Sequence, residues 1–409
     1  MRARCAMALL LLGSCGNLLG IEELSGPSSS GDDVPPDDTA PPLADCSVQR
    51  VVHLVGGTAG LAWFTLEWPL PEVIASFAPT FAYDDPSLAK LVLGNPHALF
   101  ARKIGARAIW EGIGTNSQPT AFVAGNNETH TNSPASIVNV VSSGLIAAGA
   151  SLQSSLEPEI PVLAFLRVDS YGNAVGAPSP VVVPNTEGAI GVFPRIPAAQ
   201  LRPTPTQLAR YGITGATQTG MVNLATQLAF TANAFKLGLI ATVIMPAFND
   251  DPHGAFDSGL ATQRANELAL ALDAFYADLA QASETTCGNN GSALSLADNT
   301  VLIVTGDTPK NSFDRVGWPD GTPGSLNLMY VRGNGFTKPG WFGSASVMAG
   351  MALRTNFNPN TGADDPTVAT VTSTNAAYAA TLFAIARGNR TAVGQFTSAP
   401  FDGVVGSGQ

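Results

Sequence analysis

The stretch Phe235-Lys-Leu-Gly-Leu-Ile-Ala-Thr-Val-Ile-Met-Pro-Ala-Phe-Asn-Asp-Asp-Pro-His-Gly254 decides the fold expected for this chain of 409 residues. Its part 239–245 is apolar, rich in β-branched residues and free of charge, which predicts a strand buried on both faces. The strand is expected to stop at Pro246, where polar residues follow. Open α/β sheets place their sites just beyond the carboxyl ends of strands, so Asp251 and His253 are the first candidates for a site.

Similar strands alternate with helices along the rest of the chain. The run 300–305 is expected to form a second buried strand, and Gly306-Asp307 follows it directly. Further strands are expected at 50–55, 160–167, 180–184 and 326–331, and further helices at 207–237 and 375–387. The clearest helix is 261–282, because Leu268, Leu272, Phe275 and Leu279 recur at helical spacing and form one apolar stripe. This alternation predicts an α/β fold with a central, mostly parallel sheet flanked by helices.

The composition is that of a secreted globular protein with many loops. Hydrophobic residues make up 45% of the chain and charged residues 12%, with 42 Gly and 30 Pro. The net charge is −11, and the basic residues form no cluster. Both features disfavour nucleic acid and anionic membrane surfaces as partners.

The first 15 residues predict a lipoprotein signal peptide. A short basic segment, Met1-Arg-Ala-Arg4, precedes an apolar stretch at 6–12 that is too short to span a bilayer. The segment Leu12-Gly-Ser-Cys15 is similar to a bacterial lipobox, in which the cysteine is lipidated, so Cys15 is expected to anchor the protein to a membrane through lipid. Gly16, where an Asp would indicate retention at the inner membrane, favours an outer-membrane lipoprotein, periplasmic or surface-exposed. The alternative is an ordinary signal peptide that carries a cysteine.

Residues 16–45 are expected to form a disordered tether rich in Pro, Ser and Asp, since they hold too few large apolar residues to bury. Residues 46–409 are then one domain. Cys5 leaves with the signal peptide and Cys15 carries lipid, so Cys46 and Cys287 remain. In an oxidising compartment an even remainder indicates one disulfide. The alternative is two unpaired thiols.

Four histidines could take part in chemistry. His53 lies inside a strand and is expected to be a packed structural residue, His97 lies in a turn sequence, and His130 lies in a polar loop. His253 is the best candidate, because Asp251 lies two positions before it and oxygen and nitrogen donors at that spacing suit zinc or manganese. The chain holds no Gly-x-Ser-x-Gly, no Cys-x-x-Cys, no phosphate-binding P-loop and no Gly-x-Gly-x-x-Gly after a strand.

Several motifs also follow one another in a set order. They are Val55-Gly-Gly-Thr-Ala-Gly-Leu61, Thr129-His130, Asn249-Asp-Asp-Pro-His253, Phe275-Tyr-Ala-Asp-Leu279, Gly306-Asp-Thr-Pro-Lys-Asn311, Gly321-Thr-Pro-Gly-Ser325 and a late helix at 378–386. Their order over most of residues 50–395 resembles an uncharacterised exported bacterial family within the alkaline phosphatase/sulfatase-like superfamily. The resemblance implies an alkaline-phosphatase-like sandwich with metal at the carboxyl ends of strands. It further implies Asp251, His253 and Asp307 as metal ligands, and Thr129, as the counterpart of a nucleophile, with His130 and Lys310 as catalytic residues.

The sequence departs from the family pattern at several of these positions. Ala59 replaces the Asp after the first strand, and the Glu after the second buried strand is shortened to Asp307. Lys310 replaces an Arg, which keeps the positive charge but not the two parallel donors of the guanidinium group. Pro323-Gly324 replaces an Asp-His pair, and neither residue offers a side-chain ligand. A two-metal hydrolase needs two full ligand sets.

Too few ligands remain for two metals unless Asp314 or Asp320 substitutes. The expectation is therefore a catalytically degenerate protein of the cell envelope with a binding or structural role, without a metal cofactor and with an unknown protein or polysaccharide partner. The alternative is a hydrolase of phosphate or sulfate esters with a reduced site that holds one divalent metal, zinc, manganese or calcium. A third possibility is a polysaccharide- or protein-binding module of unrelated mechanism.

Overall fold

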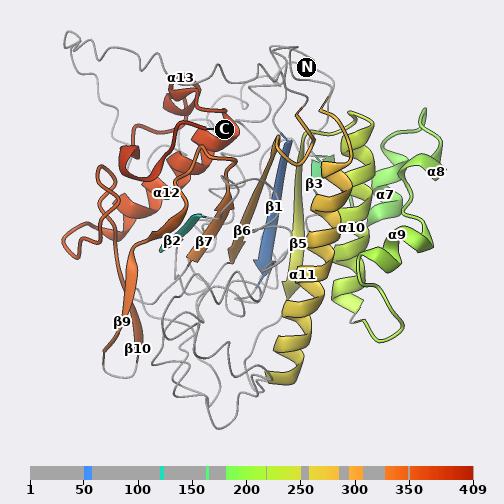
Figure 1. Ribbon diagram of the computed structural model, residues 1–409, viewed down its shortest axis with the longest axis horizontal. Coiled ribbons are helices and arrows are strands. Elements are labelled where there is room, and N and C mark those ends of the chain that lie inside the picture. The colour runs from blue at the N-terminus through green and yellow to red at the C-terminus, as the bar shows by residue number, and fades with distance from the viewer. Residues whose placement is uncertain are drawn as a thin grey trace, which may run out of the picture. The chain divides into compact units, whose positions relative to one another are not determined.

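An eight-stranded sheet forms the centre of the fold (Figure 1). The computed structural model describes residues 50–57, 120–123, 163–164, 181–217, 219–249, 258–284, 294–306, 328–348 and 351–408. All of them belong to the unit Leu43–Gln409, one of two into which the chain divides, the other being Met1–Pro42. The strands are β1 (Arg50–Gly57), β2 (Thr120–Val123), β3 (Leu163–Ala164), β4 (Val181–Val182), β5 (Thr242–Asn249), β6 (Thr300–Gly306), β7 (Leu328–Arg332) and β8 (Gly340–Phe342).

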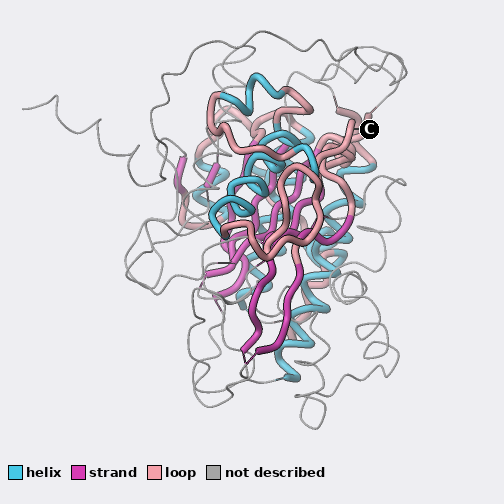
Figure 2. The backbone as a smooth tube through the Cα atoms, turned by 90° about the vertical axis from the view of Figure 1, so that its left-hand side faces the viewer, coloured by secondary structure: helices cyan, strands magenta, loops and turns pink. Residues whose placement is uncertain are grey.

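The sheet is mixed but mostly parallel. Its order is β4-β3-β5-β1-β6-β7-β2-β8. Every neighbouring pair is parallel except β6 with β7 and β7 with β2, so β7 alone runs against the other strands. A separate antiparallel hairpin joins β9 (Ser344–Met348) to β10 (Met351–Thr355), and Figure 2 shows its two strands side by side. The predicted α/β class with a mostly parallel sheet is confirmed.

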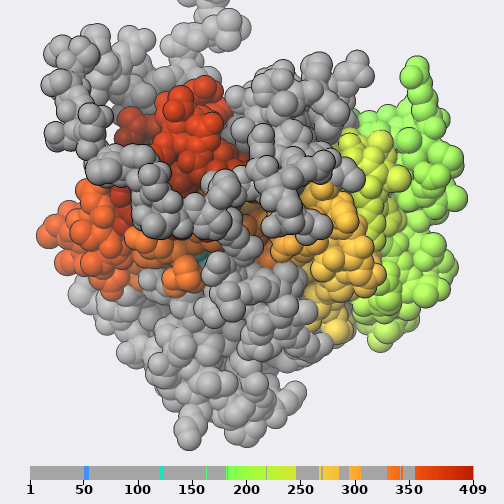
Figure 3. All heavy atoms as spheres, turned by 45° about the horizontal axis from the view of Figure 1, so that its top comes forward, coloured from blue at the N-terminus to red at the C-terminus, as the bar shows by residue number. Residues whose placement is uncertain are grey.

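Helices pack on both faces of the sheet. The longer helices are α10 (Thr219–Lys236), α11 (Ser258–Ala280) and α12 (Thr370–Ile385). The shorter ones are α7 (Thr186–Gly191), α8 (Ala198–Leu201), α9 (Pro205–Arg210), α13 (Arg390–Gly394) and the 3₁₀ turn Asp402–Val404. The helices α7, α8 and α9 contact α10 and lie beside it on the surface in Figure 3.

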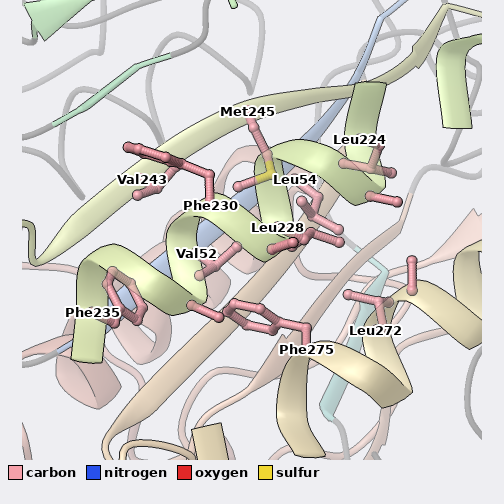
Figure 4. Packing of buried hydrophobic residues seen from close by; sticks show 14 of the residues in the cluster. Val52, Leu54, Leu224, Leu228, Phe230, Phe235, Val243, Met245, Leu272 and Phe275 are labelled. Atoms are coloured by element: carbon pink, nitrogen blue, oxygen red, sulfur yellow. The ribbon is translucent and has the colours of Figure 1, made fainter. Parts of the chain in front are cut away.

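The central strands bury side chains on both faces, as their composition predicts. Val52 and Leu54 of β1 join a core cluster with α10 and α11, where they lie near Leu228 and Phe275 (Figure 4). Val51, one position away, joins a second cluster with α12 on the opposite face. Each such side chain contributes roughly 1.5–3 kcal/mol when it is fully buried. This two-sided burial explains why apolar residues predominate in the central strands.

The predicted apolar stripe of α11 is confirmed. Leu268, Leu272, Phe275 and Leu279 are all fully buried in the cluster shared with α10. The helix begins at Ser258 and ends at Ala280, close to the expected bounds. A period of 3.6 residues brings these four positions onto one face, and that face packs on the sheet and α10.

The prediction of a single helix over residues 207–237 is wrong. The segment forms α9 and α10, with a turn between Tyr211 and Thr217. Gly212 has φ +79°, and the Ile213 amide donates to the Leu208 carbonyl oxygen at 3.1 Å. A left-handed glycine just after a helix is a strong stop signal, and it outweighs the helical composition on either side.

The expected end of the central strand at Pro246 is also wrong, because β5 continues to Asn249. Val55 pairs with Pro246, and Gly57 pairs with Asn249. Between these two pairs β5 advances by three residues and β1 by two, so the ladder contains a β-bulge. The described residues of β3 pair with β5 only at Val243 and Ile244. Proline is tolerated at bulges and where a strand lacks a neighbour, which accounts for its place inside β5.

Candidate functional site

Three parallel strands end side by side at one edge of the sheet. Gly57 at the end of β1 pairs with Asn249 at the end of β5, and Gly56 pairs with Gly306 at the end of β6. Neighbouring strands lie about 4.8 Å apart, which separates the ends of β5 and β6 by roughly 10 Å. We call this the carboxyl edge, and it is where an open α/β sheet holds its ligands.

The reversed strand β7 brings a fourth segment to the carboxyl edge. Because β7 is antiparallel to both β6 and β2, the strand β2 runs in the direction of β6. Val123, where β2 ends, pairs with Leu328, where β7 begins. The chain therefore leaves β5, β1, β6 and β2, and enters β7, along one edge of the sheet.

The metal-binding and catalytic residues predicted from the sequence lie outside the described residues, but each follows a described strand end. Asp251 and His253 come two and four positions after Asn249, and Asp307 and Lys310 come one and four positions after Gly306. Thr129 and His130 come six and seven positions after Val123, and Asp314 and Asp320 lie in the connection from β6 to β7. A chain reaches at most about 3.3–3.6 Å per residue, so these connections are long enough to meet.

Within the described part of the chain, no group of three His, Cys, Asp or Glu side chains could hold a metal ion. Asp251, His253 and Asp307 lie outside the described residues.

His53 lies in the core and not at the carboxyl edge. It sits between Ile244 and Ile303 in the register of the sheet and is fully buried. Burial lowers the pKa of its imidazole from 6.5 to about 3, so it is neutral near pH 7. Four strand positions separate it from Gly57, a distance of about 13 Å. The prediction that His53 is a packed structural residue is confirmed.

The opposite edge of the sheet, where β1, β5 and β6 begin, is called the amino edge. It holds a buried ion pair that could not be predicted from the sequence. Arg50 opens β1, and its Nε donates to Glu284 Oε2 at 3.2 Å while both side chains are buried. Arg50 also donates to the Ile240 carbonyl oxygen at 2.6 Å, and Asn299 donates to Glu284 at 2.8 Å. Through these hydrogen bonds, Ile240 just before β5 and Asn299 just before β6 are connected to the start of β1. These contacts stabilise the sheet at the edge opposite the candidate site.

A second buried carboxylate, Asp278, also has a structural role. It belongs to the Phe275–Leu279 motif, and it accepts hydrogen bonds from Gln207 at 2.9 Å and Tyr211 at 3.1 Å. Arg210 pairs with it at 2.9 Å. Burial, and then the charge of Asp278, raise the pKa of the Tyr211 hydroxyl. This part of the motif therefore fixes α9 against α11 and does not line the carboxyl edge.

The predicted disulfide between Cys46 and Cys287 concerns residues on either side of the Arg50–Glu284 contact. Cys46 lies four positions before Arg50 and Cys287 three positions after Glu284, both outside the described residues. The described residues nearest to the two cysteines are therefore in contact, and the disulfide, whose Cα atoms must lie within about 7 Å of each other, stays a prediction. We expect mass spectrometry of the unreduced protein to find the two cysteine peptides linked, and reduction to cost about 2–5 kcal/mol of unfolding free energy.

Single and double serine variants provide the control for this bond. Cys46→Ser, Cys287→Ser and the double variant should lose equal stability, because each removes the same bond. Two thiols that react with a maleimide in the denatured, unreduced protein would show instead that both cysteines are free.

Among the helices that the structure describes, none is long and apolar enough to cross a membrane. No family model matches the chain, and comparisons with curated proteins and with solved structures found no match either.

Proposed function

We propose that this chain is a lipid-anchored protein of the cell envelope whose phosphatase/sulfatase-like domain binds a ligand at the carboxyl edge without hydrolysing it. The observation that carries this proposal is the direction of the strands. The segments with Thr129, Asp251 and Asp307 follow β2, β5 and β6, and these three strands end at one edge. Segments far apart in the sequence thus begin along one edge of the sheet, as the family resemblance implies.

The mostly parallel sheet supports the proposed fold. The family resemblance implies a central, mostly parallel sheet, and among the eight described strands of the sheet only β7 runs antiparallel to its neighbours. Helices on both faces of the sheet agree with the sandwich that the motif order implies. A fold of this kind does not by itself imply catalysis.

The lost ligands support a role without hydrolysis. Ala59 comes two positions after the end of β1, where the family pattern has an Asp. Pro323 and Gly324, in the connection from β6 to β7, replace an Asp-His pair. A two-metal mechanism needs both metals to activate the nucleophile and to stabilise the leaving group. These three positions remove ligands that two metals would need.

A second candidate function, a hydrolase with a single metal, has one observation in its favour. The two strands that precede Asp251, His253 and Asp307 flank β1 with ends roughly 10 Å apart. Ligands from both connections could therefore meet at one ion, and Thr129 would supply the nucleophile, with His130 and Lys310 beside it.

Assays on the full chain decide between the two functions. The protein, purified in detergent, is incubated with aryl phosphates and aryl sulfates in the presence of zinc, manganese or calcium, and its metal content is measured by elemental analysis. The proposal expects no hydrolysis above that of a His253→Ala variant. Stoichiometric metal together with activity that His253→Ala abolishes would establish the hydrolase instead.

The lipid anchor has its own test. Mass spectrometry of the mature protein is expected to find an acylated Cys15 as its first residue, because acyl chains with about 0.8 kcal/mol per buried CH₂ anchor a protein stably. Cys15→Ser should move the protein from the membrane fraction to the soluble fraction, whereas Cys287→Ser should leave it in the membrane fraction. A wild-type protein in the soluble fraction would overturn the anchor and leave the proposal for the carboxyl edge standing.

A further inference from the structure

We draw no further inference here: the strongest candidate, the buried Arg332 guanidinium stacked on Tyr276 at the amino edge of the sheet, carries nothing because it already donates to the carbonyl oxygens of Ala297 and Thr300 and to Asn334, and these contacts make it a part of the core.

Discussion

Between pH 6.5 and pH 3, His53 is expected to cost the protein about 1.4 kcal/mol of unfolding free energy for each pH unit of acidification. In the folded state burial lowers its pKa to about 3, while in the unfolded chain the pKa returns to 6.5. Between these values the unfolded state binds a proton that the folded state does not, so acid favours unfolding. Above pH 6.5 both states are neutral and the effect vanishes.

Urea denaturation at pH 7.5 and pH 5.0 measures this effect. Wild type should lose about 2 kcal/mol more than His53→Leu between the two conditions, because the leucine cannot be protonated. Val52→Ala is the matched control on the same strand. It removes buried methyl groups and should lower the unfolding free energy equally at both pH values. Equal pH dependence in wild type and His53→Leu would show that His53 does not couple folding to protons.

Loss of the Arg50–Glu284 pair is expected to have an effect of similar size. Glu284→Leu leaves the guanidinium of Arg50 buried without the carboxylate that accepts from its Nε at 3.2 Å. Removing one partner of a buried pair costs about 3–5 kcal/mol, and replacing both partners by apolar residues costs much less. The double variant Arg50→Met/Glu284→Leu should therefore be more stable than Glu284→Leu. Chemical denaturation of the wild type, both single variants and the double variant gives the coupling energy.

An exposed ion pair offers a matched control for this cycle. Arg202 and Glu187 pair at 2.6 Å, but their side chains are 52% and 64% exposed. Solvent screens such pairs, so Glu187→Gln should change the stability little. If Glu284→Leu were as mild as Glu187→Gln, the pair at the amino edge would not be an important support of the sheet.

Helices and strands could be predicted from the sequence where apolar residues recur at helical spacing or fill a whole segment. The stripe on α11 and the largely apolar strands β1, β5 and β6 follow directly from their residues. The direction of β7 could not be predicted, because an apolar strand has the same composition whichever way it runs. The four-residue strand β2 was missed for a related reason, since its pairing with β7 is a contact across the sequence.

The candidate site could also be predicted only in part, because contacts between distant segments do not follow from the sequence. Its residues could be named because polar side chains follow buried strands, as Asp251 follows β5 and Asp307 follows β6. Which strands are neighbours depends on the order of the sheet, and that order is set by packing between distant segments. Glu284 was missed because a polar sequence after α11 indicates a solvated loop, whereas its carboxylate reaches back to the first strand.

We predict that the carboxyl edge brings Asp251, His253 and Asp307 together, and an experimental structure that shows these three side chains tests this prediction. Their donor atoms should lie within about 5 Å of one another, so that all three could approach a single ion at about 2.0–2.2 Å after small rotations. Side chains on opposite faces of the sheet, or donor atoms more than about 10 Å apart, would show that the prediction is wrong, since no single ion could then be shared.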